Sequence, residues 1–307
     1  MALARFTLSN DLLDDEPGLQ QRYAEDGYLF FTDVLDTLAV ARVRDDLMGV
    51  LTAQGIVEAG TAEPVATGVG VEAVDDNAMY AVNSYLELCD SDEMRSLLRA
   101  VLGEEVFVFR GTNIRYALPR DDLHVTPPHQ DHFFVGPNDD FRTVWIPLME
   151  IDESVGGLAV ARGSHRAGLR DHIEQEDAES YVFIGRKQKG VPLATVEEEW
   201  LTADYEPGQV LVFHSHAVHR ALPNRSHLVR LSLDARCQPA RTPRTFQARS
   251  TMLELRRFRS DVHAVAIEVG LSEPVFERVV AEMMKRGLPA AREAVERVAD
   301  ELDRAVD

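Results

Sequence analysis

The residue types that bind metal ions are concentrated in one stretch of the sequence. Nine of the ten histidines lie between residues 124 and 227, and His129 and Asp131 form a His-x-Asp pair directly after Pro127-Pro128. On an extended segment these two side chains point to the same side, because side chains of a strand alternate with a period of two. An imidazole and a carboxylate on one face are two of the three ligands of a two-histidine, one-carboxylate Fe(II) site. The pair therefore predicts part of a non-haem iron centre.

The third ligand must come from a second histidine-rich segment, residues 208–227. Four histidines compete for the position: His214, His216, His219 and His227. We choose His219 because it stands at the end of a predicted strand, just before the Pro223-Asn224 turn, and eleven residues before Arg230. A hairpin between the two strands would bring Arg230 close to the metal. His216 is the alternative ligand.

Arginine side chains near these positions could bind carboxylates. A hairpin would set Arg230 and Ser232 on one face, where the guanidinium can hold the far carboxylate of a dicarboxylate and the hydroxyl can serve as a second donor. Arg115 alternates with Asn113 on a predicted strand, residues 111–116, and would face the cavity. It would suit a carboxylate of the substrate.

Short runs of β-forming residues must position these side chains. From residue 106 onward they lie at 106–109, 143–146, 158–161, 209–213 and 229–233, with proline, glycine and asparagine between them. Many short strands at such spacing indicate an antiparallel barrel or sandwich. Before them we predict a helix that ends at Gly27, a strand at 28–31 and a helix at 34–51. Residues 54–80 could form a lid over a site or a plain surface connection, and residues 171–206 read as a charged insert.

The end of the chain is predicted to be helical again. Beyond residue 270 a stripe of apolar residues recurs at helical spacing, formed by Val295, Val298, Leu302 and Val306. We expect residues 1–250 to form one catalytic domain and residues 251–307 to form a helical extension that packs on it. The stripe is compatible with a monomer or a homodimer.

Composition excludes several other classes of protein. The 307 residues are 45% hydrophobic, and 52 acidic against 32 basic residues give a net charge of −20. So acidic a surface repels phosphate backbones, so a nucleic-acid partner is not expected. No run approaches the roughly 18 apolar residues of a membrane span, and the first residues lack the pattern of a secretory signal. The two cysteines, Cys89 and Cys237, are too few for a disulfide framework, so we expect a reduced, cytoplasmic protein.

Taken together, these motifs resemble the phytanoyl-CoA dioxygenase family of Fe(II)/2-oxoglutarate oxygenases. The resemblance rests on His129-x-Asp131, His219 and Arg230-x-Ser232, and it covers about residues 20–240. Residues 23–29 (Tyr-Ala-Glu-Asp-Gly-Tyr-Leu) resemble the helix-to-strand step that opens the family's sequences. Residues 156–165 (Gly-Gly-Leu-Ala-Val-Ala-Arg-Gly-Ser-His) resemble a second family motif, in which Val155 and Arg162 replace the usual Asn and Pro.

The resemblance implies a mainly β protein with flanking helices and a double-stranded β-helix core of the jelly-roll or cupin kind. It implies that His129, Asp131 and His219 hold Fe(II), that Arg230 binds the cosubstrate 2-oxoglutarate, and that O2 is the oxidant. Trp145 would line the cosubstrate site beside Ser232, and Asn113 would contact the cosubstrate's other end. Where the family often has Thr, this chain has Leu158, so that polar contact is absent or comes from another residue.

The implied activity is hydroxylation of an unactivated C–H bond in a small molecule, with desaturation or cyclisation as variants. Related halogenases carry a small residue in place of the carboxylate, so Asp131 argues against halogenation. Two alternatives use the same residues differently. A cupin-like dioxygenase or isomerase would keep the metal and use Arg230 only structurally, whereas a non-catalytic β-helix protein would merely bind a ligand. The Arg230-x-Ser232 pair argues against the first, and the complete set of metal ligands argues against the second.

Overall fold

The chain folds into two compact units, Met1–Arg249 and Ser250–Asp307. A computed structural model describes residues 3–135, 138–174, 182–183, 186–187, 189–243, 262–263, 265–286 and 291–304. The assignment of residues 1–250 to one catalytic domain and of residues 251–307 to a helical extension stays a prediction. Val306 of the predicted apolar stripe lies outside the described residues, and the packing of the helical extension on the larger unit stays a prediction.

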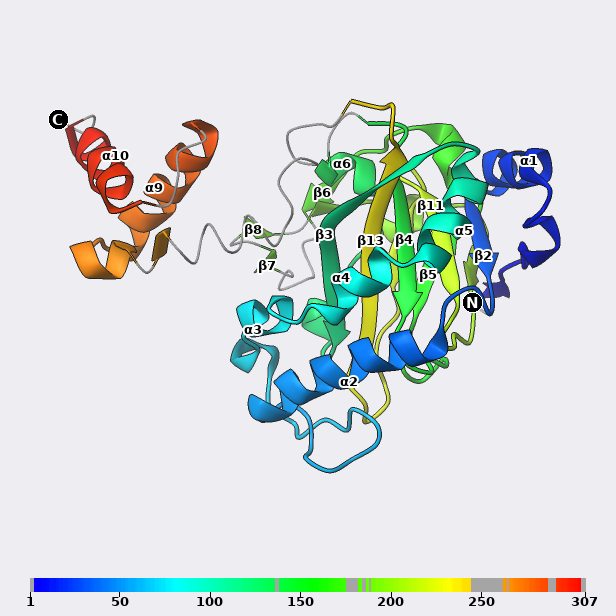
Figure 1. The fold of residues 1–307 in the computed structure, drawn as a ribbon, viewed down its shortest axis with the longest axis horizontal. Coiled ribbons are helices and arrows are strands. Elements are labelled where there is room, and N and C mark those ends of the chain that lie inside the picture. Colours follow the sequence, from blue (N-terminus) through cyan, green and yellow to red (C-terminus); the bar gives the residue numbers. More distant parts are fainter. Residues whose placement is uncertain are drawn as a thin grey trace. The chain divides into compact units, whose positions relative to one another are not determined.

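The main sheet of the larger unit has five strands in the order β2-β11-β4-β13-β3, and every neighbouring pair is antiparallel (Figure 1). The strands are β2 (Tyr28–Phe31), β11 (Val210–His214), β4 (Arg142–Pro147), β13 (Arg230–Pro239) and β3 (Val106–Ala117). Each contains a run of β-forming residues that predicted it. The central strands β11, β4 and β13 are buried along almost their whole length. Strands β11 and β4 are correspondingly apolar, whereas β13 also buries polar and charged side chains.

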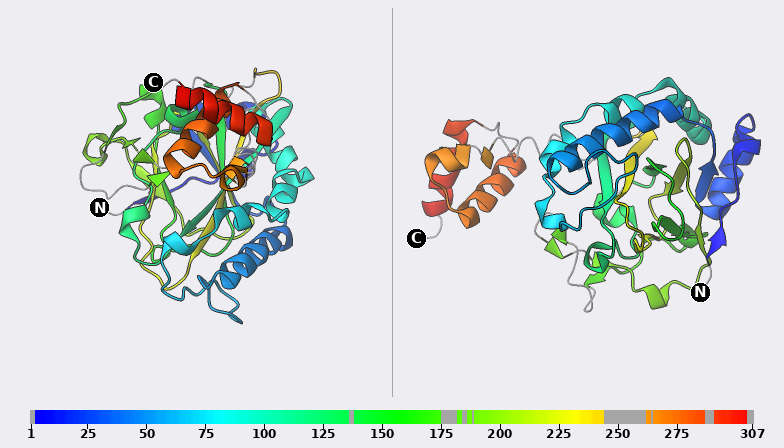
Figure 2. Two further views of the ribbon diagram at one scale, coloured as in Figure 1. Left: turned by 90° about the vertical axis from the view of Figure 1, so that its left-hand side faces the viewer. Right: turned by 90° about the horizontal axis from the view of Figure 1, so that it is seen from below.

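A second sheet has the order β1-β10-β5-β12. It consists of β1 (Ala4–Arg5), β10 (Trp200–Thr202), β5 (Leu158–Ala161) and β12 (His219–Ala221). Strand β10 lies inside the segment that we predicted to be a charged insert, so that part of the prediction was wrong. Its three residues are too short a run to show a period. Seen from below, the strands of the two sheets curve around a common interior (Figure 2).

Helices from the first third of the chain cover the outer face of the main sheet (Figure 1). They are α1 (Glu16–Asp26), α2 (Thr37–Ala53), α3 (Asp76–Tyr80), α4 (Ser84–Cys89) and α5 (Asp92–Leu102). Helix α1 begins where the carboxylate of Asp15 accepts a hydrogen bond from the backbone N–H of Gly18. It ends at Gly27, whose φ of 78° is the left-handed conformation typical of a glycine cap. The chain then enters β2 directly, as predicted.

The remaining elements are short. They are the 3-10 turns η1 (Asn10–Leu12), η2 (Val71–Ala73), η3 (Asp122–His124), η4 (Ser164–Ala167) and η5 (Leu193–Thr195), the helix α6 (Asp131–Val135), and the strands β6 (Ile173–Glu174), β7 (Val182–Phe183), β8 (Arg186–Lys187) and β9 (Lys189–Gly190). Residues 54–80 are not a featureless loop, because Val65 forms a β-bridge with Leu228 and η2 and α3 follow.

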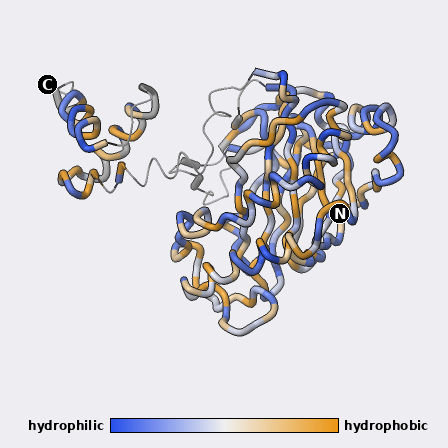
Figure 3. Tube along the Cα trace, viewed as in Figure 1, coloured by the Kyte–Doolittle hydropathy of each residue, from blue (hydrophilic) through white to orange (hydrophobic). Residues whose placement is uncertain are grey.

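Hydrophobic residues follow the strands of both sheets, and polar residues follow the connections (Figure 3). The smaller unit has a core of its own between α9 (Glu273–Arg286) and α10 (Arg292–Arg304). Val295 and Val298 of the predicted stripe are fully buried in it against Val279 and Met283. Among the described residues, no helix is long and apolar enough to span a membrane.

Candidate functional site

The predicted metal ligands meet in the interior of the larger unit. The Oδ1 atom of Asp131 lies 3.6 Å from Nε2 of His129 and 3.8 Å from Nε2 of His219. All three side chains are buried, and the two imidazole rings are 4.1 Å apart between their centroids. Three donor atoms within 4.8 Å of one another, two of them imidazole nitrogens and one a carboxylate oxygen, suit the two-histidine, one-carboxylate geometry of a non-haem Fe(II) site.

Hydrogen bonds fix the tautomers of both histidines. Nδ1 of His129 donates to the carbonyl of Pro127 over 2.9 Å, and Nδ1 of His219 donates to the carbonyl of Ala217 over 3.0 Å. A carbonyl can only accept, so the proton of each neutral ring is on Nδ1 and Nε2 keeps its lone pair. In both cases the unprotonated nitrogen is the one that faces Asp131. Such backbone partners orient histidine ligands and make them more basic.

The two carboxylate oxygens of Asp131 make different contacts. Its Oδ1 faces the histidines, whereas Oδ2 accepts a hydrogen bond from the hydroxyl of Thr143 and lies 3.3 Å from Nη2 of Arg236. Thr143 and Arg236 are direct partners in the pairing of β4 with β13, so both side chains leave the sheet on the same face. They hold the carboxylate with one oxygen turned toward the histidines.

Electrostatics give these groups the protonation states that metal ligands need. Burial alone would raise the pKa of Asp131, but the charge of Arg236, followed by the imidazoles of His219 and His129, holds the pKa of this carboxyl well below its usual range. Burial, reinforced by His129, lowers the pKa of His219 to about 3. At neutral pH the site therefore offers an anionic carboxylate and a neutral imidazole.

The backbone around the ligands is held by further polar contacts. Between the first two ligands, the side-chain amide of Gln130 donates to the carbonyls of Gly168 and His216 over 2.8 and 2.7 Å. Ser164, in the Gly-Ser-His part of the second resemblance motif, accepts a hydrogen bond from the backbone of Val218 over 2.8 Å. These contacts tie the segment of Asp131 to that of His219, and tie both to the η4 turn and the glycine that follows it.

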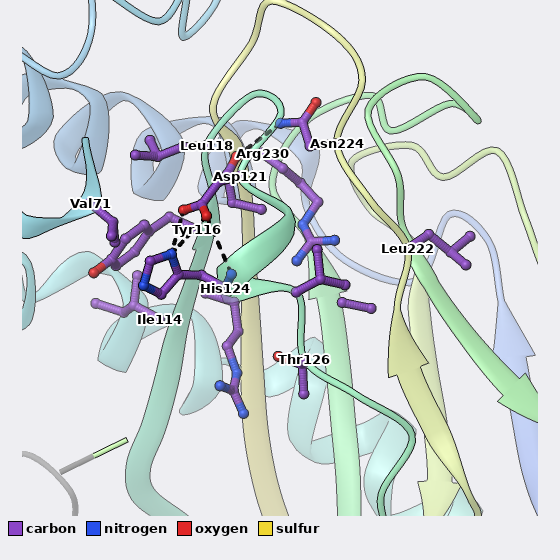
Figure 4. A pocket seen from close by; sticks show the side chains of 14 residues that line it. Val71, Ile114, Tyr116, Leu118, Asp121, His124, Thr126, Leu222, Asn224 and Arg230 are labelled. Carbon is purple, nitrogen blue, oxygen red and sulfur yellow. Dashed lines mark hydrogen bonds and ion pairs between the residues drawn. The ribbon is translucent and has the colours of Figure 1, made fainter. Parts of the chain in front are cut away.

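Arg230 lines a pocket of the larger unit (Figure 4). The pocket lies between β3, the η3 turn and the segment that follows β12, with the hydrogen-bonded pair Asp121 and His124 at one side. Nη1 of Arg230 donates to the carbonyl of Gly156. Burial and the nearby Arg115 lower the pKa of Arg230 to about 10, so the guanidinium is still charged at neutral pH. A buried cation in a pocket favours an anionic ligand.

Several buried polar atoms near Arg230 are left without hydrogen-bond partners among the described residues. They are Nε of Arg230, Oγ of Ser232 and Oδ1 of Asn113. Ser232 and Asn113 lie on the neighbouring strands β13 and β3, and their register places both on the interior face. Buried polar groups are nearly always paired in folded proteins, so this set fits a ligand with several oxygen atoms, such as 2-oxoglutarate.

Trp145 and Arg115 also lie on the interior face of the main sheet. Trp145 is buried and packs edge-on against Tyr205, with ring centroids 4.6 Å apart. Nε of Arg115 donates to Asp234 over 2.7 Å, and Asp234 lies 3.4 Å from Nη2 of Arg236. Charges of alternating sign therefore connect Arg115, at the pocket, with Asp131.

Two parts of the sequence reasoning were wrong in detail. His219 and Arg230 do not belong to one hairpin, because β12 is in the second sheet and β13 is in the main sheet. Asp131 does not continue an extended segment either, because it begins helix α6. The structure groups His219 with His129 and Asp131, while His216 lies in a different cluster and His214 and His227 lie in neither.

The sequence reasoning missed Thr143, Asp234 and Arg236. A signal for the last two was present, since charged or polar residues alternate with apolar ones along β13: Arg230, Ser232, Asp234, Arg236 and Gln238. In a strand whose ten residues are all buried, such alternation indicates that one face lines a polar site. Thr143 carries no such signal, because a threonine is ordinary in a strand.

Comparison with known proteins agrees with this site. Residues 23–232 match the phytanoyl-CoA dioxygenase (PhyH) family. A 1-deoxypentalenic acid 11-beta-hydroxylase of Streptomyces arenae is 39% identical over 246 residues, which are 77% of this chain and 86% of the hydroxylase. A probable alpha-ketoglutarate-dependent hypophosphite dioxygenase of Stutzerimonas stutzeri is 29% identical over 227 residues, or 69% of this chain and 74% of that protein.

A solved structure shares the fold. The epimerase SnoN, in complex with Fe3+, alpha ketoglutarate and nogalamycin RO, superposes with a TM-score of 0.52 at 20% identity. The match covers 74% of this chain and 85% of SnoN. Together with the family match and the two sheets, it confirms the predicted double-stranded β-helix core.

Proposed function

Because the chain belongs to the phytanoyl-CoA dioxygenase family and is a non-haem Fe(II)/2-oxoglutarate-dependent hydroxylase, we propose that it hydroxylates a small organic acid, with His129, Asp131 and His219 as the iron ligands. We further assign the far carboxylate of 2-oxoglutarate to Arg230. The observation that carries the proposal is the set of three buried donors that face one another.

When bound, Fe(II) and 2-oxoglutarate supply the oxidising chemistry that inserts oxygen from O2 into a C–H bond while the cosubstrate is converted to succinate and carbon dioxide. The protein's own part is positioning. Thr143 and Arg236 hold the second oxygen of Asp131, and the carbonyls of Pro127 and Ala217 fix the two histidines. Ser232 and Asn113 offer polar atoms beside Arg230 for the cosubstrate.

An acidic substrate is supported by the charges of the pocket. Arg115 and Arg230 both line it, in a protein whose net charge is −20. The charge of Arg115 lowers the pKa of Arg230, so a second anion in the pocket would stabilise both guanidinium groups, with Asp234 already paired to Arg115 and 2-oxoglutarate assigned to Arg230. The two hydroxylase relatives are named for an acid, 1-deoxypentalenic acid. We therefore assign the substrate's carboxylate to Arg115.

Paired substrates test this assignment. The iron-loaded enzyme is incubated with 2-oxoglutarate, O2 and either 1-deoxypentalenic acid or its methyl ester, along with other small carboxylic acids and their esters. Succinate and hydroxylated product are quantified together. We expect turnover of acids and little turnover of esters. Arg115→Gln should raise the KM for the acid about tenfold, the effect of losing roughly 1.4 kcal/mol of binding, with the KM for 2-oxoglutarate nearly unchanged.

Equal turnover of acid and ester would contradict the assignment of a carboxylate to Arg115, while leaving the reaction class intact. If the iron-loaded enzyme forms no succinate, whether a substrate is present or absent, the proposed site itself would be contradicted.

A further inference from the structure

A second group of metal-binding side chains lies outside the candidate iron site. His132, His216 and Asp139 offer three ligand atoms within 4.8 Å of one another. Oδ1 of Asp139 is 3.4 Å from Nε2 of His216 and 3.6 Å from Nδ1 of His132. The two rings meet nearly at a right angle, at 86°, with their centroids 4.1 Å apart. His132 lies in α6, Asp139 lies in the segment before β4, and His216 lies in the turn between β11 and β12.

Two of these donors are buried atoms that lack a hydrogen-bond partner anywhere in the part of the chain that the structure describes. They are Nδ1 of His132 and Nε2 of His216. The carboxylate oxygen between them is too distant for a good hydrogen bond to either nitrogen. Because buried nitrogens are nearly always paired, these two atoms are suited to bind a group that the described residues do not supply.

The separations match the requirements of a small tetrahedral ion. With metal–ligand bonds of about 2.0–2.1 Å, as for Zn²⁺, neighbouring ligand atoms of a tetrahedron are roughly 3.3 Å apart. The two distances to Asp139 exceed this value by only a few tenths of an ångström. Two imidazoles and a carboxylate are also ligands that zinc and similar borderline metals accept.

Backbone contacts hold the three residues in place. The N–H of His132 donates to the carbonyl of Ser215, and the N–H of His216 donates to Nδ1 of His214, both over 3.0 Å. The carbonyl of Asp139 accepts from Nη1 of Arg142 over 2.8 Å. The side chain of Asp139 is 79% exposed, so solvent can reach the fourth position of a tetrahedral shell.

We propose that His132, His216 and Asp139 form a second metal site, which binds a divalent transition-metal ion such as Zn²⁺ with water as the fourth ligand. His132 follows Asp131 directly, and His216 precedes His219 by three residues. The ion would therefore link the two segments that carry these iron ligands. Its expected effect is to stabilise the folded protein, because a ligand that binds only the folded state raises the free energy of unfolding.

Metal counting on the full-length protein tests the site. Protein stripped of metal is dialysed against Zn²⁺, and bound zinc per chain is measured by mass spectrometry. Wild type should hold two ions, since zinc also enters the iron site. His132→Asn combined with His216→Gln should hold one. Asp139 is exposed, so replacing it should not impair folding. Asp139→Asn should lower the affinity for one of the two zinc ions at least tenfold. The matched variant of the other site, His129→Asn with His219→Gln, should also hold one.

A single ion in wild type, lost on changing His129 and His219, would overturn the second site and leave the proposed function standing. Two ions retained in the His132 and His216 variant would overturn it as well. Two ions retained in the His129 and His219 variant would instead contradict the iron-ligand assignment. Thermal unfolding gives a second readout: with the iron ligands replaced, zinc should raise the Tm, and Asp139→Asn should abolish that rise.

Discussion

His129 and His219 are paired residues of one antiparallel β-bridge. The N–H of His129 donates to the carbonyl of His219 over 2.9 Å, and the N–H of His219 donates to the carbonyl of His129 over 3.0 Å. The two proposed iron ligands are 90 residues apart in sequence, yet their backbones are fixed to each other directly. The distance between their backbones is therefore set by main-chain hydrogen bonds. A catalytic metal site needs ligands that are held rigidly in this way.

His219→Ala should abolish iron retention and succinate formation, because two ligands hold Fe(II) much less tightly than three. His227→Ala is the matched control, since His227 is an exposed histidine of the same segment. It should keep both properties. Iron per chain after gel filtration is the measurement, and retention of iron by His219→Ala would show that another residue is the ligand.

Arg236→Met should lower the affinity for iron by about ten- to a hundredfold, the usual effect of removing a group that orients a metal ligand. The reason is that Oδ2 of Asp131 would keep only the hydroxyl of Thr143. Arg241→Met, which removes an exposed arginine paired with Glu104 just beyond the same strand, should bind iron like wild type. Anaerobic titration with Fe(II) compares them, and equal affinities would mean that Arg236 has no part in positioning.

Arg230→Leu should raise the concentration of 2-oxoglutarate needed for turnover about ten- to a hundredfold, while iron binding stays nearly intact. A lost charge-assisted hydrogen bond in a buried site costs on the order of 1.5–3 kcal/mol. Arg225→Leu is the control, because Arg225 is exposed and paired with Asp122. An unchanged apparent affinity for 2-oxoglutarate in Arg230→Leu would remove the cosubstrate assignment.

Gly156→Ala should destabilise the protein more than Gly60→Ala. Both glycines have positive φ, 73° and 81°, so each change carries the left-handed penalty of roughly 1–2 kcal/mol. At Gly156 a Cβ would also lie 2.3 Å from the carbonyl oxygen of Pro223, whereas at Gly60 it meets nothing within 4 Å. Thermal unfolding of the two variants should therefore differ. Equal Tm values would show that the segment at Gly156 can move aside.

The sequence predicted the main-sheet strands and the proposed iron ligands, but not how the ligands are supported. Runs such as residues 210–213 are apolar because both faces of the strand are buried, and that pattern is local. The contact of Arg236 with Asp131 depends on strand register between distant segments, which no local pattern contains. Helix α5 could also have been predicted, because Met94, Leu97, Leu98 and Val101 recur at helical spacing and are all buried. The cluster at Asp139 had none, because an exposed aspartate is ordinary.

Replacement of Asp131 by asparagine tests the central claim most directly. The side chain keeps its size and loses the negative charge, so folding is preserved as far as a single change allows. Asp204→Asn serves as the control, because Asp204 is a surface residue paired with Arg5. Iron content and succinate formation are measured on the same preparations. If His129, Asp131 and His219 hold the iron, Asp131→Asn should lose most of its iron and nearly all succinate formation, while Asp204→Asn should match wild type. Wild-type levels of iron and succinate in Asp131→Asn would contradict this assignment.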